Sequence, residues 1–387
     1  EKKDLGAYYT PPELVDFVLQ VSLDRLVEER LAEASDDPED RQRALLDLRV
    51  CDPACGSGAF LIGAIDRIAL ALAKERCAGE QPTDADLQLA RRDALRHCMY
   101  GVDKDDFAVE LCKVALWIHC AVPDMPLSFL DHRIQHGDSL VGWPLLDLPK
   151  IIPSDAYQLP SKIASGKDPD SMKSAAFLRE AKSRNDALLA GQMELGQELP
   201  TPKVEVDFPA IMVEDERCPA DVERKNEAYR QYQQSEGYRR FKAAADLWTG
   251  AFFWGPDACA EAPTTKTYRD ALNANVSARQ VQAAADVLEE FPALHWPLAF
   301  PEIRARGGFD CVVGNPPWEQ VKLFEEEWFA PRKPGIAAVR NSTERTRLVE
   351  ALRVTDPELH SVWRRTQVAY DRLAEYMRNS ERYTACG

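Results

Sequence analysis

The chain has 387 residues, 45% of them apolar and 29% charged, which is enough for one large domain or two ordinary ones with a substantial core. Its net charge of −16 argues against a protein that coats nucleic acid non-specifically. The chain has no apolar run of about 18 residues, so no membrane span is predicted. Ten scattered cysteines, without two CxxC pairs at zinc spacing, favour reduced thiols in a cytoplasmic protein and no metal site.

The first half of the chain alternates between helices and strands. A helix is predicted over 11–30, with Thr10 as its N-cap and Pro11 at its first position, and a polar acidic loop follows it. Strands are then predicted at 46–51, 98–102 and 132–136, with helices at 58–76 and 105–122 between them. This order predicts an α/β domain with a parallel sheet and right-handed crossovers, in which ligands bind at the carboxyl ends of the strands.

The second half of the chain is mostly helical. Helices are predicted near 169–192, 220–247 and 277–290, the strand pattern resumes at 309–313, and only helices follow Glu319. We therefore predict the N-terminal half of an α/β domain at 1–149, a mainly helical insertion at 150–306, and a strand, a loop and helices at 307–387. The first ten residues lack an initiator methionine and an apolar signal core, which suggests a piece of a longer chain.

Three acidic residues follow three successive predicted strands. Asp52 precedes a Gly-x-Gly turn formed by Gly56 and Gly58, while Asp103 and Asp138 come after the next two strands. Glycine lets a backbone approach a ligand closely, although any tight turn between a strand and a helix can use a lone Gly-x-Gly. The third glycine of a dinucleotide site and the Gly-Lys-Ser/Thr of a P-loop are both missing. The pattern therefore favours a nucleoside site without a dedicated phosphate clamp.

The last predicted strand runs directly into "GNPPW", residues 314–318. Proline fixes φ and has no N–H, so Pro316 and Pro317 predict a stiff, extended loop at the end of the strand. That loop would hold Asn315 and Trp318 in place.

Five motifs in this order, "YYTPPEL", "DPACGSGAFL", "GVDKDD", "HGDSL" and "GNPPW", resemble the S-adenosylmethionine-dependent N6-adenine DNA methyltransferases. More narrowly, the chain is similar to the gamma-type enzymes of type IIG restriction-modification and phage-defence systems. The resemblance covers residues 6 to 140 and 307 to 330. It implies a Rossmann-like methyltransferase fold of seven strands, of which only four are predicted here. The sheet is therefore expected to be incomplete in this fragment, and the fragment alone to be inactive or weakly active on DNA.

The resemblance also implies roles for single residues. The site-specific enzyme would transfer a methyl group to the N6 amine of an adenine flipped out of double-stranded DNA, and other subunits of a defence system are further expected partners. The side-chain oxygen of Asn315 and the carbonyl of Pro316 would accept hydrogen bonds from the amine, while Trp318 would stack on the base. The residues implied for the cofactor are Tyr9, Thr10, Asp52, Ala54, Cys55, Gly56 and Gly58 at the methionine end, Asp103 at the ribose, and Lys104, Asp138 and Ser139 at the adenine.

Other functions share this chemistry. Protein glutamine methyltransferases and some RNA base methyltransferases also use an Asn-Pro-Pro-aromatic loop, and a non-catalytic DNA-sensing subunit could keep the cofactor pocket. The stretch 331–353 carries six basic residues against two acidic ones and is the predicted phosphate contact, through Arg332, Lys333, Arg345 and Arg347. The tyrosine-containing stretch 223–242 is more typical of a solvated helix with an apolar stripe than of a DNA-binding arm.

Overall fold

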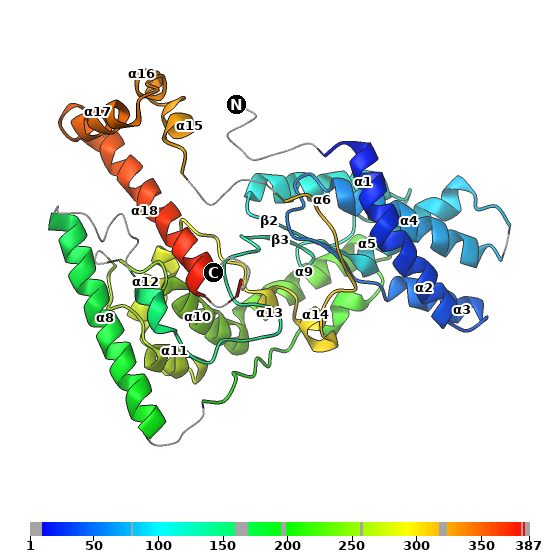
Figure 1. Ribbon diagram of the computed structural model, residues 1–387. Coiled ribbons are helices and arrows are strands. Elements are labelled where there is room, and N and C mark those ends of the chain that lie inside the picture. The colour runs from blue at the N-terminus through cyan, green and yellow to red at the C-terminus, as the bar shows by residue number, and fades with distance from the viewer. Residues whose placement is uncertain are drawn as a thin grey trace. The chain divides into compact units, whose positions relative to one another are not determined.

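The computed structural model describes residues 10–78, 80–158, 169–194, 199–255, 258–316, 323–380 and 382–383. The chain divides into two compact units (Figure 1). The α/β unit comprises Glu1–Pro149, Thr201–Ala245 and Phe291–Pro317, and the helical unit comprises Lys150–Pro200, Asp246–Glu290 and Trp318–Gly387. Residues 201–245, part of the insertion predicted at 150–306, therefore group with the sheet.

The sheet of the α/β unit has four short parallel strands. They are β1 (Val50–Asp52), β2 (Met99–Asp103), β3 (Ile134–His136) and β4 (Cys311–Val312), in the spatial order β3-β2-β1-β4. This confirms the four predicted strands and the parallel α/β class. β1 is buried along its whole length, as expected for a central strand with neighbours on both sides.

The helices of the α/β unit begin close to the predicted positions, with two corrections. The N-cap of the first helix is Pro11 rather than Thr10, and no side chain caps it. The predicted acidic loop contains a helix, because the Asp37 side chain caps it and Pro38 takes its first position. The helical elements are α1 (Pro12–Leu19), the π-turn η1 (Gln20–Asp24), α2 (Arg25–Glu33), α3 (Pro38–Leu46), α4 (Ala59–Arg76), α5 (Asp84–Cys98), α6 (Asp106–Cys120), η3 (Ala210–Val213), α9 (Pro219–Gln234), α13 (Trp296–Ala299) and α14 (Pro301–Arg306), while α10 (Glu236–Gly250) runs from this unit into the other.

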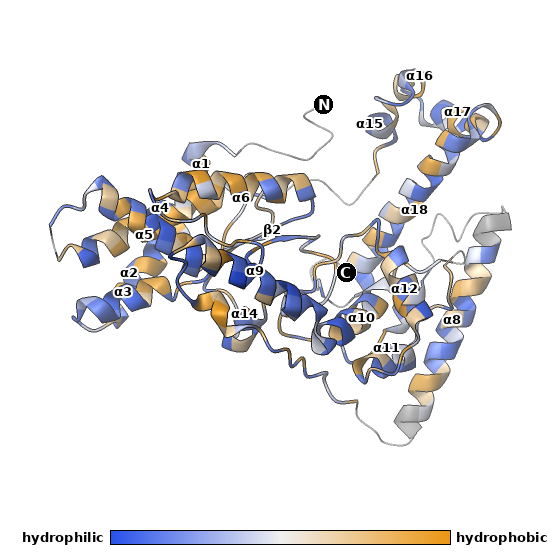
Figure 2. Ribbon diagram, turned by 180° about the vertical axis from the view of Figure 1, so that it is seen from behind, coloured by the Kyte–Doolittle hydropathy of each residue, from blue (hydrophilic) through white to orange (hydrophobic). Residues whose placement is uncertain are grey.

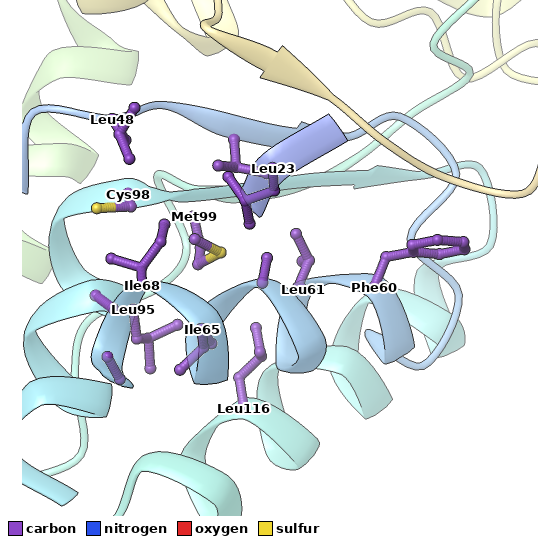
Figure 3. Close-up of a cluster of buried hydrophobic side chains, with 14 of the residues drawn as sticks. Leu23, Leu48, Phe60, Leu61, Ile65, Ile68, Leu95, Cys98, Met99 and Leu116 are labelled. Carbon is purple, nitrogen blue, oxygen red and sulfur yellow. The ribbon is translucent and has the colours of Figure 1, made fainter. Parts of the chain in front are cut away.

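Each face of the sheet has its own apolar core. Alternate residues of a strand point to opposite faces, so Val50 and Met99 join one cluster whereas Cys51 and Tyr100 join the other. In the first cluster, α4 contributes apolar side chains at three- and four-residue spacing (Figure 3). The second cluster is formed against segment 294–303, whose Phe300 ring meets the ring of Tyr100 edge-on at 5.4 Å between centroids. The sheet is therefore covered on both faces.

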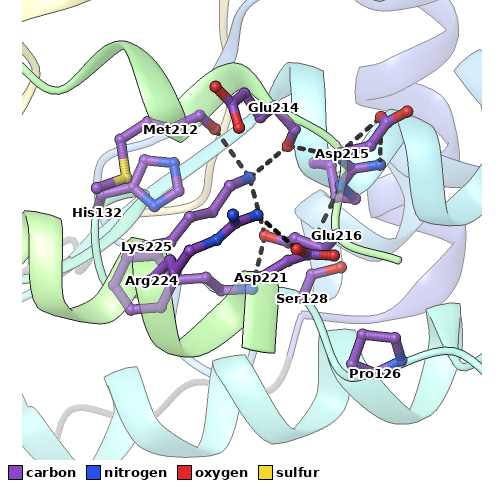
Figure 4. Close-up of polar contacts among 12 residues, drawn as sticks. Pro126, Ser128, His132, Met212, Glu214, Asp215, Glu216, Asp221, Arg224 and Lys225 are labelled. Carbon is purple, nitrogen blue, oxygen red and sulfur yellow. Dashed lines mark hydrogen bonds and ion pairs between the residues drawn. The ribbon is translucent and has the colours of Figure 1, made fainter. Parts of the chain in front are cut away.

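The stretch 201–245 is held to the α/β unit by packing and by charge. α9 is largely hydrophilic (Figure 2), but Tyr229 and Tyr232 turn inward into a cluster with Phe129 and Met212. This is the arrangement of an amphipathic helix with an apolar stripe. Beside the cluster, the buried carboxylate of Glu216 pairs with the ammonium of Lys225 (Figure 4), at 3.0 Å between the two atoms.

Three more groups surround the Glu216 carboxylate. The Phe129 backbone N–H donates to it at 3.2 Å, and the guanidinium groups of Arg92 and Arg96 lie 3.7 Å and 3.5 Å away. Replacing Glu216 with alanine is expected to lower the free energy of unfolding by about 3–5 kcal/mol, because buried cations then lose their counter-charge. Urea unfolding measures this change.

Arg224→Ala is the matched control for Glu216→Ala. The side chain of Arg224 pairs with Asp221 at 2.6 Å on the same helix but is 61% exposed, so its loss should cost less than about 1 kcal/mol. Equal losses of stability in the two variants would contradict an anchoring role for Glu216.

The helical unit contains no strand among its described residues, in agreement with the pattern predicted after Glu319 and in the middle of the chain. Its elements are η2 (Ser154–Tyr157), α8 (Pro169–Glu194), α11 (Thr265–Leu272), α12 (Ala278–Val287), α15 (Glu325–Phe329), α16 (Pro334–Ala337), α17 (Ser342–Thr355) and α18 (Pro357–Asn379). The buried amide of Asn185 links three segments, donating to the Ile152 carbonyl at 2.9 Å and accepting from the Thr265 N–H at 2.8 Å. In the described ranges, no helix combines the length and apolarity that crossing a membrane requires.

Candidate active site

The first part of the site is the turn between β1 and α4. Gly58 precedes the helix with φ +88° and Gly56 has φ +51°, a backbone region that favours glycine. The Cys55 N–H donates to the Val102 carbonyl at 2.9 Å, which fixes the turn against β2. No other atom lies within 4 Å of the position that a Cβ on Gly56 would take, so the turn borders open space at this point. The Cys55 thiol, in contrast, is buried beside Cys112, and both this contact and burial raise its pKa.

Asp103 at the end of β2 is held in a fixed orientation by backbone donors. One carboxylate oxygen accepts the Gly56 N–H at 2.8 Å, and the other accepts the Asp105 N–H at 2.9 Å. A carboxylate offers about four acceptor positions, so this half-exposed group retains capacity for ligand hydroxyls. Lys104, the next residue, is exposed, and its backbone carbonyl contacts Nε2 of His136 at 3.2 Å.

Asp52 is the buried acid of the site. Its side chain is 1% exposed, and Oδ1 accepts the Ala54 N–H at 3.0 Å. Burial raises the pKa of this carboxyl from its ordinary 3.8 to about 7, with a further contribution from the negative charge of Asp103. Asp52 therefore titrates near neutral pH in the folded protein.

The raised pKa of Asp52 makes stability depend on pH. The folded protein holds the Asp52 proton more tightly than the unfolded chain does. The contribution of this proton to stability is therefore fully present below pH 3.8 and is lost as the pH rises through about 7. The Asp52→Asn side chain cannot ionise. Between pH 5 and pH 8, the free energy of unfolding of this variant should therefore rise, relative to that of the original protein, by on the order of 2 kcal/mol. Urea unfolding of both proteins at the two pH values measures this gain. A constant difference would show that Asp52 ionises with an ordinary pKa.

The loop after β3 carries Asp138 and Ser139. Asp138 accepts the Leu140 N–H at 2.9 Å through its side chain, and its own N–H donates to the Pro292 carbonyl at 2.6 Å. The indole N–H of Trp296 donates to the Ser139 carbonyl at 3.1 Å. Segment 291–296 is thus a part of the site that the sequence motifs did not indicate. Its only local signal is the dense run of aromatic residues and prolines in "FPALHWPLAFP" ahead of β4.

The candidate catalytic loop begins where β4 ends. The Val313 N–H donates to the Cys51 carbonyl at 2.9 Å, so the chain stays beside β1 up to Gly314. A Cβ on Gly314 would lie 2.6 Å from Oδ1 of Asp52, which means that only glycine fits against this carboxylate. Asn315 follows, and its amide nitrogen contacts the Thr10 hydroxyl at 3.5 Å.

The register of the sheet brings these candidates to one edge. Asp52 pairs with Gly101, Cys51 with Val312, and Asp103 with His136, so the carboxyl ends of all four parallel strands meet there. Thr10, Asp52, Ala54, Gly56, Gly58, Asp103, Lys104, Asp138, Ser139, Asn315 and Pro316 all belong to the α/β unit. Tyr9, Pro317 and Trp318 lie outside the described residues. Among the residues that the structure describes, no three His, Cys, Asp or Glu side chains are grouped as metal ligands would be.

The basic residues predicted to contact DNA lie in the helical unit, and their charges are partly compensated there. Arg345 is mostly buried and pairs with Glu325 at 3.1 Å and Glu326 at 2.6 Å. Lys333 pairs with Asp356 at 3.2 Å, while the guanidinium of Arg332 lies over the Trp328 ring. Counted over 325–356, six basic residues stand against six acidic ones, so the local excess predicted for 331–353 disappears. Arg347 is exposed on α17.

Comparison with known proteins bears on this geometry. The family model for the Eco57I restriction-modification methylase matches residues 97–345, and the model for the MmeI DNA-methyltransferase domain matches residues 30–159. A putative type II restriction enzyme and methyltransferase of Methanocaldococcus jannaschii is 24% identical over 365 residues, covering 82% of this chain and 28% of that protein. No solved structure matches. The first family model matches more than half of this chain, and the chain therefore belongs to the Eco57I restriction-modification methylase family.

Proposed function

We propose that the protein is a site-specific DNA methyltransferase that modifies the N6 amine of an adenine flipped out of double-stranded DNA, with S-adenosylmethionine as methyl donor, in a restriction-modification or phage-defence system. The observation that carries the proposal is the meeting of the glycine turn, Asp103 and Asn315 at one edge of the sheet. The matches to the MmeI DNA-methyltransferase domain and to the restriction enzyme and methyltransferase of M. jannaschii support DNA as the substrate.

The residues at this edge fit S-adenosylmethionine. When bound, this cofactor supplies an electrophilic methyl group on a sulfonium. Open space beside Gly56 leaves room for a ligand against the turn, and the oriented carboxylate of Asp103 can accept hydrogen bonds from ribose hydroxyls. Asp52, beside the same turn, can supply negative charge near the methionine end, while the loop of Asp138 and Ser139 would take the adenine ring.

Asn315 is suited to activate a planar amine. The lone pair of such an amine is delocalised into its ring, and acceptors on both hydrogens draw the nitrogen toward tetrahedral geometry. The contact between the Asn315 amide nitrogen and Thr10 orients the amide, and Pro316 supplies a neighbouring carbonyl on a backbone with fixed φ. Acceptors held in place before the reaction stabilise charge as it develops on the nitrogen. Trp318 is proposed as the stacking surface for the flipped base.

The decisive experiment supplies labelled S-adenosylmethionine to the full-length protein in parallel reactions with adenine-containing duplex DNA, with RNA and with a glutamine-containing protein, followed by analysis of the labelled nucleosides and amino acids. N6-methyladenine in the duplex is the expected result. Label on RNA or on a glutamine side chain would instead identify an RNA or protein methyltransferase, and cofactor binding without any transfer would identify a DNA-sensing subunit.

Arg332, Lys333 and Arg347 are proposed as phosphate contacts, whereas the ion pairs of Arg345 occupy its guanidinium.

A further inference from the structure

Segment 291–296 runs alongside the loop that carries Asp138 and Ser139. Asp138 and Ala293 form a parallel bridge beyond the end of β3. Backbone hydrogen bonds continue this pairing, from Leu294 N–H to the Val141 carbonyl at 2.8 Å and from Trp296 N–H to the Trp143 carbonyl at 3.2 Å. Because β3 ends at His136, this pairing holds the loop beyond the end of the strand.

His295 provides a side-chain contact to the same loop. Its Nδ1 accepts the backbone N–H of Trp143 at 3.1 Å. The His295 side chain is 6% exposed and Trp143 is fully buried, so water cannot readily replace this acceptor. The imidazole also meets the Trp143 indole edge-on, at 6.4 Å between ring centroids. His295 thus combines a specific acceptor with ring packing.

The two segments approach each other too closely for a side chain to stand between them. Gly142 has φ +123°, and a Cβ on it would lie 2.2 Å from the Leu294 carbonyl oxygen and 3.0 Å from Nδ1 of His295. The indole of Trp296, which donates to Ser139, adds a second side-chain contact. From Asp138 to Trp143, the loop is therefore fixed by a segment about 150 residues later in the chain.

We propose that residues 291–296 are a positioning clamp for the cofactor, with His295 as the central contact, which holds the loop so that Asp138 and Ser139 can receive the adenine ring. This inference rests on the proposed function, since it assigns the loop to S-adenosylmethionine. His295 itself does not touch the cofactor in this proposal. Its role is to set the position of the residues that do.

The test is the dissociation constant of S-adenosylhomocysteine, measured by titration calorimetry on the 387-residue chain and three variants at His295. His295→Phe keeps a ring but removes the acceptor, and should raise the dissociation constant by about tenfold or more because the Trp143 N–H loses its partner. His295→Ala should do the same. His295→Asn restores an acceptor close to the position of Nδ1, and its dissociation constant should return to within about threefold of the original.

Thermal unfolding without ligand separates loss of folding from loss of the clamp. If His295→Phe does not fold, Trp296→Phe is the deciding variant, because it removes the donor to Ser139 while keeping an aromatic ring to pack against Phe300 and Phe309, and it should raise the dissociation constant by several-fold. Unchanged binding by folded His295→Phe, or by Trp296→Phe in its place, would overturn the clamp while leaving the proposed function intact. Failure of the unsubstituted chain to bind S-adenosylhomocysteine would overturn the cofactor assignment itself, and the clamp with it.

Discussion

Replacing Asn315 with alanine is expected to lower kcat for methyl transfer to DNA by about 10²–10³, the usual effect of removing one preorganised acceptor or donor at a reacting centre. The dissociation constant of S-adenosylhomocysteine should stay within about twofold, since the cofactor contacts proposed for Asp103 and the glycine turn are unchanged. Asn315→Asp keeps a side-chain oxygen at the same position and should retain more activity than the alanine variant. Single-turnover kinetics and calorimetry on the full-length protein measure both effects.

Asn341→Ala is the matched control for this experiment. The Asn341 side chain caps α17 by accepting the Thr343 N–H at 2.9 Å, so its loss should cost about 1 kcal/mol of stability and leave methyl transfer unchanged. Normal methylation by Asn315→Ala would refute the proposed role of the amide oxygen. Loss of cofactor binding in that variant would instead assign Asn315 to the cofactor.

Gly314→Ala is expected to lower methyl transfer by about 10²-fold, because a shift of about 1 Å at a reacting group has effects of this size. The added methyl group would lie 2.6 Å from Oδ1 and 3.3 Å from Cγ of Asp52. The Asp52 carboxylate is buried and accepts a hydrogen bond from the Ala54 N–H, so it cannot move aside. The backbone that carries Asn315 has to move instead. Single-turnover kinetics with saturating cofactor measure the effect.

The cause of the Gly314→Ala effect can be tested in a second background. In Asp52→Ala the carboxylate is gone, so adding Gly314→Ala should cost much less there than it does with Asp52 present. Gly191→Ala is the control glycine, since no atom outside its own helix neighbourhood lies within 4 Å of an added Cβ in α8, and alanine favours a helix by about 1 kcal/mol. Equal losses from Gly314→Ala in both backgrounds would show that Asp52 is not the obstacle.

The local pattern of the chain was sufficient to predict the strands and the chemical groups at their ends. Buried apolar runs identify β1 and β2, and the parallel order follows from the helices between them. Since parallel strands end at one edge, the order of the motifs alone predicts that Asp52, Asp103 and Asn315 meet. The sequence pattern does not predict α3, because the acidic composition of "SDDPEDRQ" favours a loop, but the capping of the helix by Asp37 outweighs that preference.

Contacts between distant parts of the chain were decided only by the tertiary structure. Asp52 and Gly314 are 262 positions apart in the sequence. Nothing in the local sequence around either residue signals that the Asp52 carboxylate will lie against the Gly314 backbone. The burial of Glu216 among cations and the pairing of Arg345 with Glu325 have the same origin, as does the acceptor that His295 provides for Trp143. Periodicity and turn chemistry describe a residue's neighbours along the chain, so they specify elements and the residues at their ends. Burial and pairing depend on which elements pack together, and that is settled by the whole fold.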